Sequence, residues 1–321
     1  MTLPVSREPD DLPASTSAAP PAGLDASGGL ELQAYTRRGL LRILRSVLRR
    51  PSALVAVIII AALIVVAVLA PLLTPHDPAK IDLDAALTGP SSGHWLGTDS
   101  LGRDNLSRLI YGARVALQIA IPSILGAFVI GASIGLIVGY VGGIVDKVFL
   151  VLFDAVISFP SVILGLALLT LLGPSKKSVV LVIALSMIPY YGRLTRAQTL
   201  SQMRNEYVRA ERALGASRAR VLRTHVMPNA LAPLLVIVAI DIPTAIAIEA
   251  GLAFLGLGVQ PPTPDWGVML NDGFTVIGTS VWPIAGPIAA LVLVTTSFTV
   301  LGETLRDELD PRSAGRVRGE G

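Results

Sequence analysis

Three carboxylates stand in apolar stretches of the chain, where an acidic side chain could carry protons or bind cations. They are Asp154, Asp241 and Glu249. Because an ionised group is costly inside a membrane, such a residue usually lines a pathway or pairs within the protein. Counting about 1.5 Å per helical residue from Asn229 places Asp241 roughly 18 Å along, near mid-depth, and Glu249 roughly 30 Å along, near the outer boundary. Asp241 and Glu249 are therefore candidate pathway residues. Alternatively, each forms hydrogen bonds between helices.

The sequence carries no pattern for covalent or nucleotide chemistry. It lacks the phosphate-binding loop G-x-x-x-x-G-K-[ST], the metalloprotease pattern H-E-x-x-H and the nucleophile elbow G-x-S-x-G. Since cysteine is absent, disulfides, thiolate metal sites and cysteine nucleophiles are excluded. The three histidines, at positions 76, 94 and 225, are scattered, and we expect them to be solvated or packing residues. We therefore predict no catalytic residue and no metal site.

Composition places the chain among integral membrane proteins. Of its 321 residues 52% are hydrophobic and 15% charged, and the mean hydropathy is +0.66. The net charge is only +3, and the basic residues flank apolar segments, so membrane topology explains the sequence pI of about 9.4 better than nucleic-acid binding does.

The hydrophobic pattern predicts an all-α polytopic protein with six spans. A crossing helix needs about 20 apolar residues, and residues 51–75 contain no charge. The predicted spans are residues 52–73, 115–140, 148–172, 179–192, 230–258 and 281–302. The fourth is short, so it should borrow residues from position 192 onward.

The remaining segments complete a membrane domain over residues 52–310. Residues 1–36 should be a disordered cytoplasmic tail, residues 37–51 a basic lead-in and residues 311–321 a second cytoplasmic tail. With both termini inside the cell, 20 of the 26 Lys and Arg residues lie on the cytoplasmic side. The positive-inside rule favours this topology over its reverse.

Two local features indicate how the spans pack. Gly131, Gly135 and Gly139 repeat every four residues, so a neighbouring helix should approach that face closely. Pro160 should kink the third span because it removes a backbone donor. Asp154 stands six residues earlier, near enough to the cytoplasmic end to reach water.

A basic segment, residues 193–229, interrupts the apolar spans. It carries eight arginines between Arg193 and Arg223 but only two acids in that interval. Apolar residues at positions 200, 203, 207, 210 and 214 predict one apolar helix face. Gly215 should end that helix, and Ser217 should cap a second helix, residues 218–225, that Met227-Pro228 terminates. Such a segment is either a solvated basic face, a patch on anionic lipid, or a docking element for a cytoplasmic partner.

At these residues the chain resembles the permease subunits of ABC importers. Their cytoplasmic motif is Glu-Ala-Ala, three residues, Gly, nine residues, then Ile-x-Leu-Pro, and Gly215 and Pro228 keep its glycine-to-proline spacing. The dipeptide, oligopeptide and nickel branch is more similar still, with E-Y-V-x-A-A-R-A-L-G-A-S and H-V-L-P-N-A-L against EYVRAERALGAS and HVMPNAL here. Because Arg209 occupies the acidic position of the triplet, Glu206 or Glu211 would supply the acidic contact.

Three further strings resemble the same branch. Residues 93–104, GHWLGTDSLGRD, are similar to H-P-L-G-T-D-x-L-G-R-D, which is typical of one of the two permease types. Residues 154–160 are similar to D-x-x-x-x-F-P. Residues 254–270 match F-L-G-L-G-x-Q-P-P-x-P-x-W-G-x-M-L almost letter for letter. The resemblance covers roughly residues 40 to 310.

This resemblance implies a type I ABC importer permease in a bacterial inner membrane, a transport subunit rather than an enzyme. It would translocate peptides or a related small solute by alternating access. Its partners would be a second homologous permease, two cytoplasmic ATPase subunits, an extracytoplasmic binding protein and membrane lipid. ATP and Mg²⁺ would be bound by the ATPases, so no cofactor is expected in this chain. The implied docking residues are Glu206, Tyr207, Arg209, Ala210, Glu211, Ala213, Gly215, Ala216, Ser217, His225 and Pro228.

A secondary transporter driven by an ion gradient is the alternative, with Asp154, Asp241 and Glu249 as a relay. Such carriers often contain inverted repeats, and no repeat is obvious between the two halves. A relay also gives no reason for the arginine-rich segment. A scaffold without transport has no positive feature behind it. Dipeptides, longer peptides and nickel complexes all remain open as solutes.

Overall fold

The computed structural model describes residues 50–309, and the regular secondary structure of this part of the chain is helical, with no strand. The all-α prediction is thus confirmed. The expected tails, residues 1–36 and 311–321, and nearly all of the basic lead-in lie outside the described residues.

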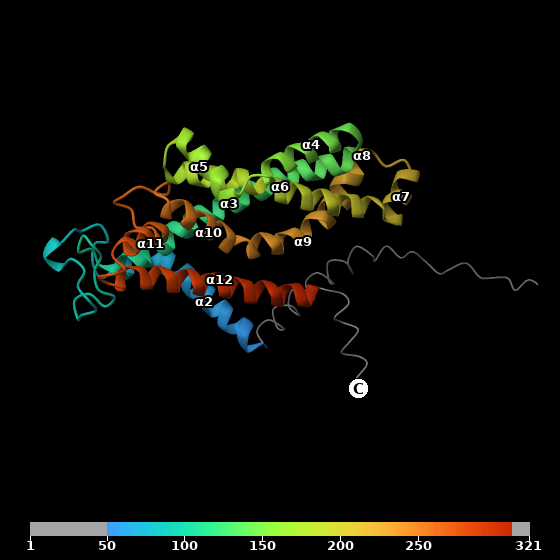
Figure 1. Cartoon of the computed structure of the whole chain (residues 1–321). Coiled ribbons are helices and arrows are strands. Elements are labelled where there is room, and N and C mark those ends of the chain that lie inside the picture. Colours follow the sequence, from blue (N-terminus) through green and yellow to red (C-terminus); the bar gives the residue numbers. More distant parts are fainter. Residues whose placement is uncertain (1–49, 310–321) are drawn as a thin grey trace, which may run out of the picture. The chain divides into compact units, whose positions relative to one another are not determined.

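The helices of the described part form one bundle (Figure 1). The long ones are α2 (Pro51–Leu73), α3 (Asn105–Val141), α6 (Lys176–Met203) and α12 (Trp282–Leu309). The shorter ones are η1 (Leu83–Ala85), α4 (Gly143–Ile157), α5 (Ser161–Leu172), α7 (Glu206–Ala213), α8 (Arg218–Val221), the π-helical turn η2 (Leu222–Val226), α9 (Met227–Ile240), α10 (Ile242–Phe254) and α11 (Trp266–Thr275). Helices α7 and α8 lie at one end of the bundle, and α11 lies at the other (Figure 1).

Within residues 50–309, five helical stretches are long and apolar enough to cross a membrane: Pro51–Leu73, Asn105–Val141, Lys176–Met203, Arg218–Ile240 and Trp282–Asp307. The bent pair α4 and α5 makes six if it counts as one span. Each of the six predicted spans overlaps, in chain order, one of these stretches or the bent pair. Their boundaries differ, because several helices continue well past the apolar residues that locate them.

The fourth span shows the largest difference in length. The apolar run predicted residues 179–192, whereas α6 extends over Lys176–Met203. Its last three turns carry Arg193 and Arg196, which pair with acids of α4, and arginine is itself a good helix former. The basic segment accordingly begins about ten residues later than position 193.

Helices α3 and α6 form the central pair, and the glycines of α3 lie between them as expected. A Cβ atom at Gly131 would lie 3.0 Å from Tyr191 Cβ, and one at Gly139 would lie 2.9 Å from Thr199 Cβ. At Gly135 it would meet the backbone of Gly192. The backbones thus approach more closely than side chains would allow, as small residues permit in membranes.

The predicted third span is broken rather than merely kinked. Helix α4 ends at Ile157, Pro160 is the N-cap residue of α5, and the two helices bend by 88°. The missing donor of Pro160 and the turn at Ser158 to Pro160 account for this break. Residues 143–147, which lie between the second and third predicted spans, form the start of α4.

Two ion pairs join α4 to α6, one near each end of α4. Arg196 Nη2 donates to Asp146 Oδ2 at 2.6 Å, and its Nε contacts the other carboxylate oxygen. Arg193 pairs with Asp154. Asp154 is exposed as expected, and it also has a cationic partner that the sequence did not identify.

Met227-Pro228 does not terminate a helix, contrary to the prediction. The chain passes from α8 through the π-helical turn η2 into α9, with Pro228 in the first turn of α9. The Met227 amide donates to Leu222, five residues back. Because proline is tolerated in a first helical turn, the helical path continues through it.

The predicted fifth span, 230–258, is divided at Asp241. This residue caps α9, and Pro243 stands in the first turn of α10. Helix α10 ends at Phe254, so only the stretch through Ile240 is long enough to cross by itself.

The loop between the first two spans, which the expected topology places outside the cell, is shorter than the predicted span bounds imply. This outer loop comprises residues 74–104, because α3 begins at Asn105 rather than near residue 115. The Asp104 side chain caps α3 by accepting from the Ser107 amide at 2.8 Å. Residues 105–114 include two arginines, and Arg108 is buried against acidic residues.

Candidate functional site

The basic segment forms a short helix, a glycine elbow and a second helix. The Gly215 amide donates to Arg212 at 3.1 Å, and the Ala216 amide donates to Glu211 at 3.1 Å. These two bonds define a Schellman motif, which requires positive φ at its glycine, and Gly215 has φ +85. Ser217 then caps α8 by accepting from the Arg220 amide at 3.3 Å. The predicted elbow is therefore present, with both expected cap residues.

The face of α7 that the periodicity predicted as apolar is largely exposed. Tyr207 is 41% exposed and Leu214 86% exposed, whereas Val208 is completely buried. The reason is that Arg204 and Asn205 interrupt the helix between α6 and α7. The three- and four-residue spacing that was counted through Met203 therefore does not continue onto one face of α7.

An apolar cluster anchors the elbow to the bundle. Its buried members are Val208 of α7, Val221 of α8, Val226 of η2, Ala230 of α9 and Leu136 of α3. Since it includes α3, a force on α7 or α8 acts on the central helix pair rather than on a loose loop.

Polar and aromatic contacts strengthen this attachment. The Tyr140 hydroxyl of α3 donates to the Arg218 carbonyl at 2.9 Å, and the Arg212 guanidinium stacks 5.5 Å from the Tyr140 ring centre. His225 Nε2 lies 3.4 Å from Glu211 Oε1, and its ring meets that of Tyr207 edge to face. His225 and Glu211 therefore hold the elbow closed across Gly215.

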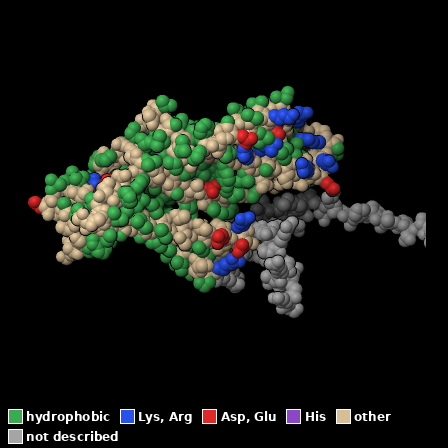
Figure 2. All heavy atoms as spheres, in the orientation of Figure 1, with side chains coloured by type: hydrophobic (Ala, Val, Ile, Leu, Met, Phe, Trp, Pro, Cys, Tyr) green, Lys and Arg blue, Asp and Glu red, His purple; other side chains and the backbone are tan. Residues whose placement is uncertain are grey.

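The outward surface of the elbow is basic with an apolar tip. Figure 2 shows Lys and Arg side chains gathered at this end of the described part. Leu214 stands among exposed arginines, which are Arg209, Arg212, Arg218 and Arg220. An exposed leucine on a rigid turn is suited to insertion into a cleft whose rim is acidic.

Asp241 borders a cavity of about 880 Å³ between helices α6, α9, α10 and α12. The Tyr191 hydroxyl donates to Asp241 Oδ2 at 2.9 Å. The wall is mostly apolar, with Thr244, Thr295 and Thr299 among its polar members, and Glu303 and Arg306 also line it. Asp241 thus has both features that the sequence left open, a cavity position and a hydrogen bond between helices.

Comparison with known proteins identifies the family. Residues 131–315 match the family of binding-protein-dependent transport system inner membrane components. The chain belongs to this family. Residues 40–90 of this permease also match the N-terminal transmembrane domain of oligopeptide transport permease C.

Curated relatives cover most of this permease. A dipeptide transport system permease protein of Alkalihalophilus pseudofirmus is 40% identical over 81% of the chain and 86% of the relative. A probable D,D-dipeptide transport system permease protein of Escherichia coli is 37% identical, with 83% and 89% covered, and the nickel transport system permease protein of Escherichia coli is 38% identical, with 82% and 95% covered. The resemblance to the peptide and nickel branch of ABC importer permeases is confirmed. These relatives give no support to the ion-gradient alternative.

The structure gathers the predicted docking residues of this permease at one end of the bundle. Glu211, Ala216 and His225 are half-buried. The others are exposed: Glu206, Tyr207, Arg209, Ala210, Ala213, Gly215, Ser217 and Pro228. Glu206 lies in the first turn of α7, where its negative charge interacts favourably with the helix dipole. Glu211 faces His225.

Glu249 is not brought to the cavity. Its side chain is completely buried in α10, beside Asp265, which caps α11 by accepting from the amides of Gly267 and Val268. The predicted pathway pair is therefore separated, with Asp241 at the cavity and Glu249 within the packing of α10 and α11.

The roles of two residues, Leu214 and Tyr140, were not identified from the sequence. Leu214 was assigned to a packed face, although its place directly before a capping glycine could have suggested exposure. Tyr140 gave no local signal, because its contacts come from residues more than 70 positions later.

Proposed function

We propose that this permease is the membrane subunit of an ATP-driven importer for di- or oligopeptides or a related small solute. The relatives are named for dipeptide, D,D-dipeptide and nickel transport, which supports a small solute of this range. Peptides are favoured because the permease matches the N-terminal domain of an oligopeptide permease as well as dipeptide relatives.

One observation carries the docking part of the proposal. Leu214, 86% exposed, projects from a glycine elbow that Val208 and Val221 anchor to α3. In this proposal a cytoplasmic ATPase receives Leu214 and the surrounding arginines in a cleft, and Glu206 supplies the acidic contact. Movement of the ATPase is then transmitted through the buried cluster to α3 and α6.

The partners follow from this arrangement. ATP and Mg²⁺ are bound by two ATPase subunits, because the sequence has no phosphate-binding loop. A second homologous permease completes the pathway, and an extracytoplasmic binding protein delivers the solute. Both termini and the elbow lie in the cytoplasm, while α11 and residues 74–104 face outward. The arginines of the elbow support this orientation through the positive-inside rule.

Asp241 lines the proposed pathway. Two of the four helices around its cavity, α9 and α10, join at Asp241, so a change in the angle between them would reshape the cavity. Alternating access is then a shift between two helix arrangements, and this chain performs no covalent chemistry.

The experiment is co-purification of the full chain from its native membrane in mild detergent. We expect an ATPase and a second permease to accompany it, identified by mass spectrometry. Leu214→Asp should lose the ATPase, because a charge replaces the apolar tip. Leu83→Asp is the matched control, an exposed leucine of the outer loop that should retain it.

Two results would contradict the docking proposal. One is equal ATPase recovery with Leu214→Asp and Leu83→Asp. The other is an intact chain that carries no ATPase and moves solute in response to a proton or sodium gradient. A further measurement separates the two solute classes. Uptake of labelled dipeptide and uptake of Ni²⁺ are compared in cells that lack the chain and in the same cells after the chain is restored.

A further inference from the structure

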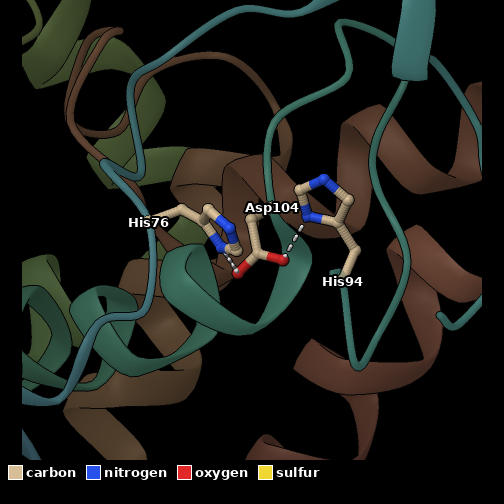
Figure 3. A group of neighbouring side chains, drawn as sticks. All are labelled: His76, His94 and Asp104. Carbon is tan, nitrogen blue, oxygen red and sulfur yellow. Dashed lines mark hydrogen bonds and ion pairs between the residues drawn. The ribbon is translucent and has the colours of Figure 1, made fainter. Parts of the chain in front are cut away.

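Two of the three histidines meet at one carboxylate, although the sequence indicated scattered residues. His94 Nδ1 lies 2.9 Å from Asp104 Oδ1, and His76 Nδ1 lies 3.8 Å from Asp104 Oδ2. The two imidazole centres are 4.8 Å apart (Figure 3). His76 follows α2, His94 belongs to the outer loop, and Asp104 caps α3, so three separate segments converge here.

We propose that His76, His94 and Asp104 bind a divalent transition-metal ion, with Zn²⁺ as the best fit. Two imidazole nitrogens and one carboxylate oxygen are ligands that Zn²⁺ accepts in protein sites with an open position. One such atom from each residue lies within 4.8 Å of the others. Ligand atoms around tetrahedral zinc are roughly 3.3 Å apart at bond lengths of about 2.0 to 2.2 Å, so a contraction of roughly 1 to 1.5 Å completes the site.

The exposure of the three side chains is suited to such a site. Asp104 is 2% exposed and fixed, whereas His94 is 25% and His76 41% exposed. The imidazoles can therefore close on the carboxylate by rotating at the surface. Their exposure also gives an ion a route from solvent and leaves a coordination position for water.

A second layer of hydrogen bonds already holds the three residues. The Ser107 amide donates to Asp104 Oδ2 at 2.8 Å, and Ser107 Oγ accepts from the His76 amide at 3.1 Å. The His94 amide donates to Ser91 Oγ at 3.1 Å. The bond to Asp104 orients a ligand carboxylate, as outer-layer bonds do in functional metal sites. The bonds to the His76 and His94 amides fix the backbone from which the two imidazoles project, and Ser107 takes part at both Asp104 and His76.

The bound ion would fasten the outer loop to the start of α3. It would close the chain between His76 and Asp104 and so hold the buried ion pairs of Asp99 and Arg103 in place. This role is separate from the proposed transport function and does not depend on which solute is carried. Without an ion, the two imidazoles contact the Asp104 carboxylate at 2.9 and 3.8 Å.

The test measures Zn²⁺ binding to the full chain, purified in detergent with a tag that contains no histidine. Calorimetry should give one Zn²⁺ per chain, and Co²⁺ should produce the absorption bands of a bound low-coordinate ion. His76→Ala and His94→Ala should each weaken Zn²⁺ binding at least about tenfold. His225→Ala is the matched control, because it removes the only other histidine of the sequence and should leave binding unchanged.

A second readout separates ligand loss from misfolding. Zn²⁺ should raise the thermal midpoint of the unaltered chain and of His225→Ala. It should raise the midpoint of His76→Ala and of His94→Ala much less. The midpoint of each protein without Zn²⁺ is its own reference, so the quantity compared is the shift in midpoint that Zn²⁺ causes. Absence of stoichiometric binding to the unaltered chain, or equal binding by His76→Ala and His94→Ala, would overturn the proposal. Either result would leave transport and ATPase docking unaffected.

Discussion

The Arg103 guanidinium donates a hydrogen bond of 3.0 Å to Asp272, a residue 169 positions later in the sequence. Arg103 also donates to Asp99 at 2.6 Å, and the buried Arg108 places its Nε 3.4 Å from that same carboxylate. These contacts join the outer loop to α11. The two family-like strings, residues 93–104 and 254–270, thus lead into one folded cap.

Asp99→Ala should destabilise this cap strongly. The substitution leaves Arg103 and Arg108 short of a carboxylate, and removal of one partner from a buried ion pair typically costs about 3–5 kcal/mol. We expect a thermal midpoint in detergent that is several degrees lower. Asp82→Ala, at an exposed position of the same loop, is the control. Equal shifts in the two variants would mean that the pairs contribute little to stability.

The packing of α3 against α6 predicts opposite effects for two glycines on α3. A Cβ atom at Gly135 would lie 2.9 Å from Thr195 Cβ and 3.0 Å from the Arg196 amide, so Gly135→Ala should destabilise by about 1–3 kcal/mol through overpacking. At Gly126 the nearest atom would be 3.9 Å away. Gly126→Ala should therefore be neutral or stabilise by up to about 1 kcal/mol. Thermal unfolding of both variants measures the difference, and similar losses would contradict close packing at Gly135 alone.

Hydropathy and local spacing were enough to predict the spans, the close glycine face and the elbow. These features depend on residues that are neighbours in the sequence, such as the cap formed by Gly215 and Ser217. Helix ends were less predictable where tertiary contacts decide them. Helix α6 continues past its apolar run through Arg193 and Arg196, and their pairing with acids of α4 cannot be recognised from the α6 sequence.

Sites that join distant segments escaped sequence reasoning altogether. His76 and His94 are 18 positions apart, and nothing in their spacing indicates that both turn toward Asp104. Asp241 and Glu249 looked equivalent as acids in one apolar stretch. Only the packing distinguishes the cavity around Asp241 from the buried contact of Glu249 with Asp265.

Substitutions at Asp241 distinguish the proposed ATP-driven importer from a transporter that uses a proton relay. Asparagine keeps an oxygen that can accept from the Tyr191 hydroxyl but cannot carry a proton. We therefore expect Asp241→Asn to retain most uptake of labelled dipeptide, and Asp241→Ala to lose more of it. The hydrogen bond itself is worth about 1 kcal/mol. Loss of uptake in Asp241→Asn as complete as in Asp241→Ala would favour the relay.

Gly215→Pro should uncouple ATP hydrolysis from solute uptake. Proline fixes φ near −65° and has no amide hydrogen, whereas Gly215 has φ +85 and its amide donates to Arg212. The Schellman turn cannot form, so the contact between His225 and Glu211 across the elbow is lost. We expect membrane insertion to persist because no span contains Gly215, while dipeptide uptake falls at least about tenfold. Uptake and ATP hydrolysis are measured together in reconstituted vesicles.

Gly173→Pro provides a matched control for that variant. Gly173 also has positive φ, +78, and its amide donates to Leu169 at 2.9 Å, so proline causes the same local damage in the turn after α5. A Cβ atom at either glycine would meet no atom within 4 Å, so neither substitution adds a clash from that atom. If turn damage alone reduced uptake, both variants would lose it equally. Normal uptake in Gly215→Pro would contradict the docking elbow directly, because the turn would then transmit nothing to α3.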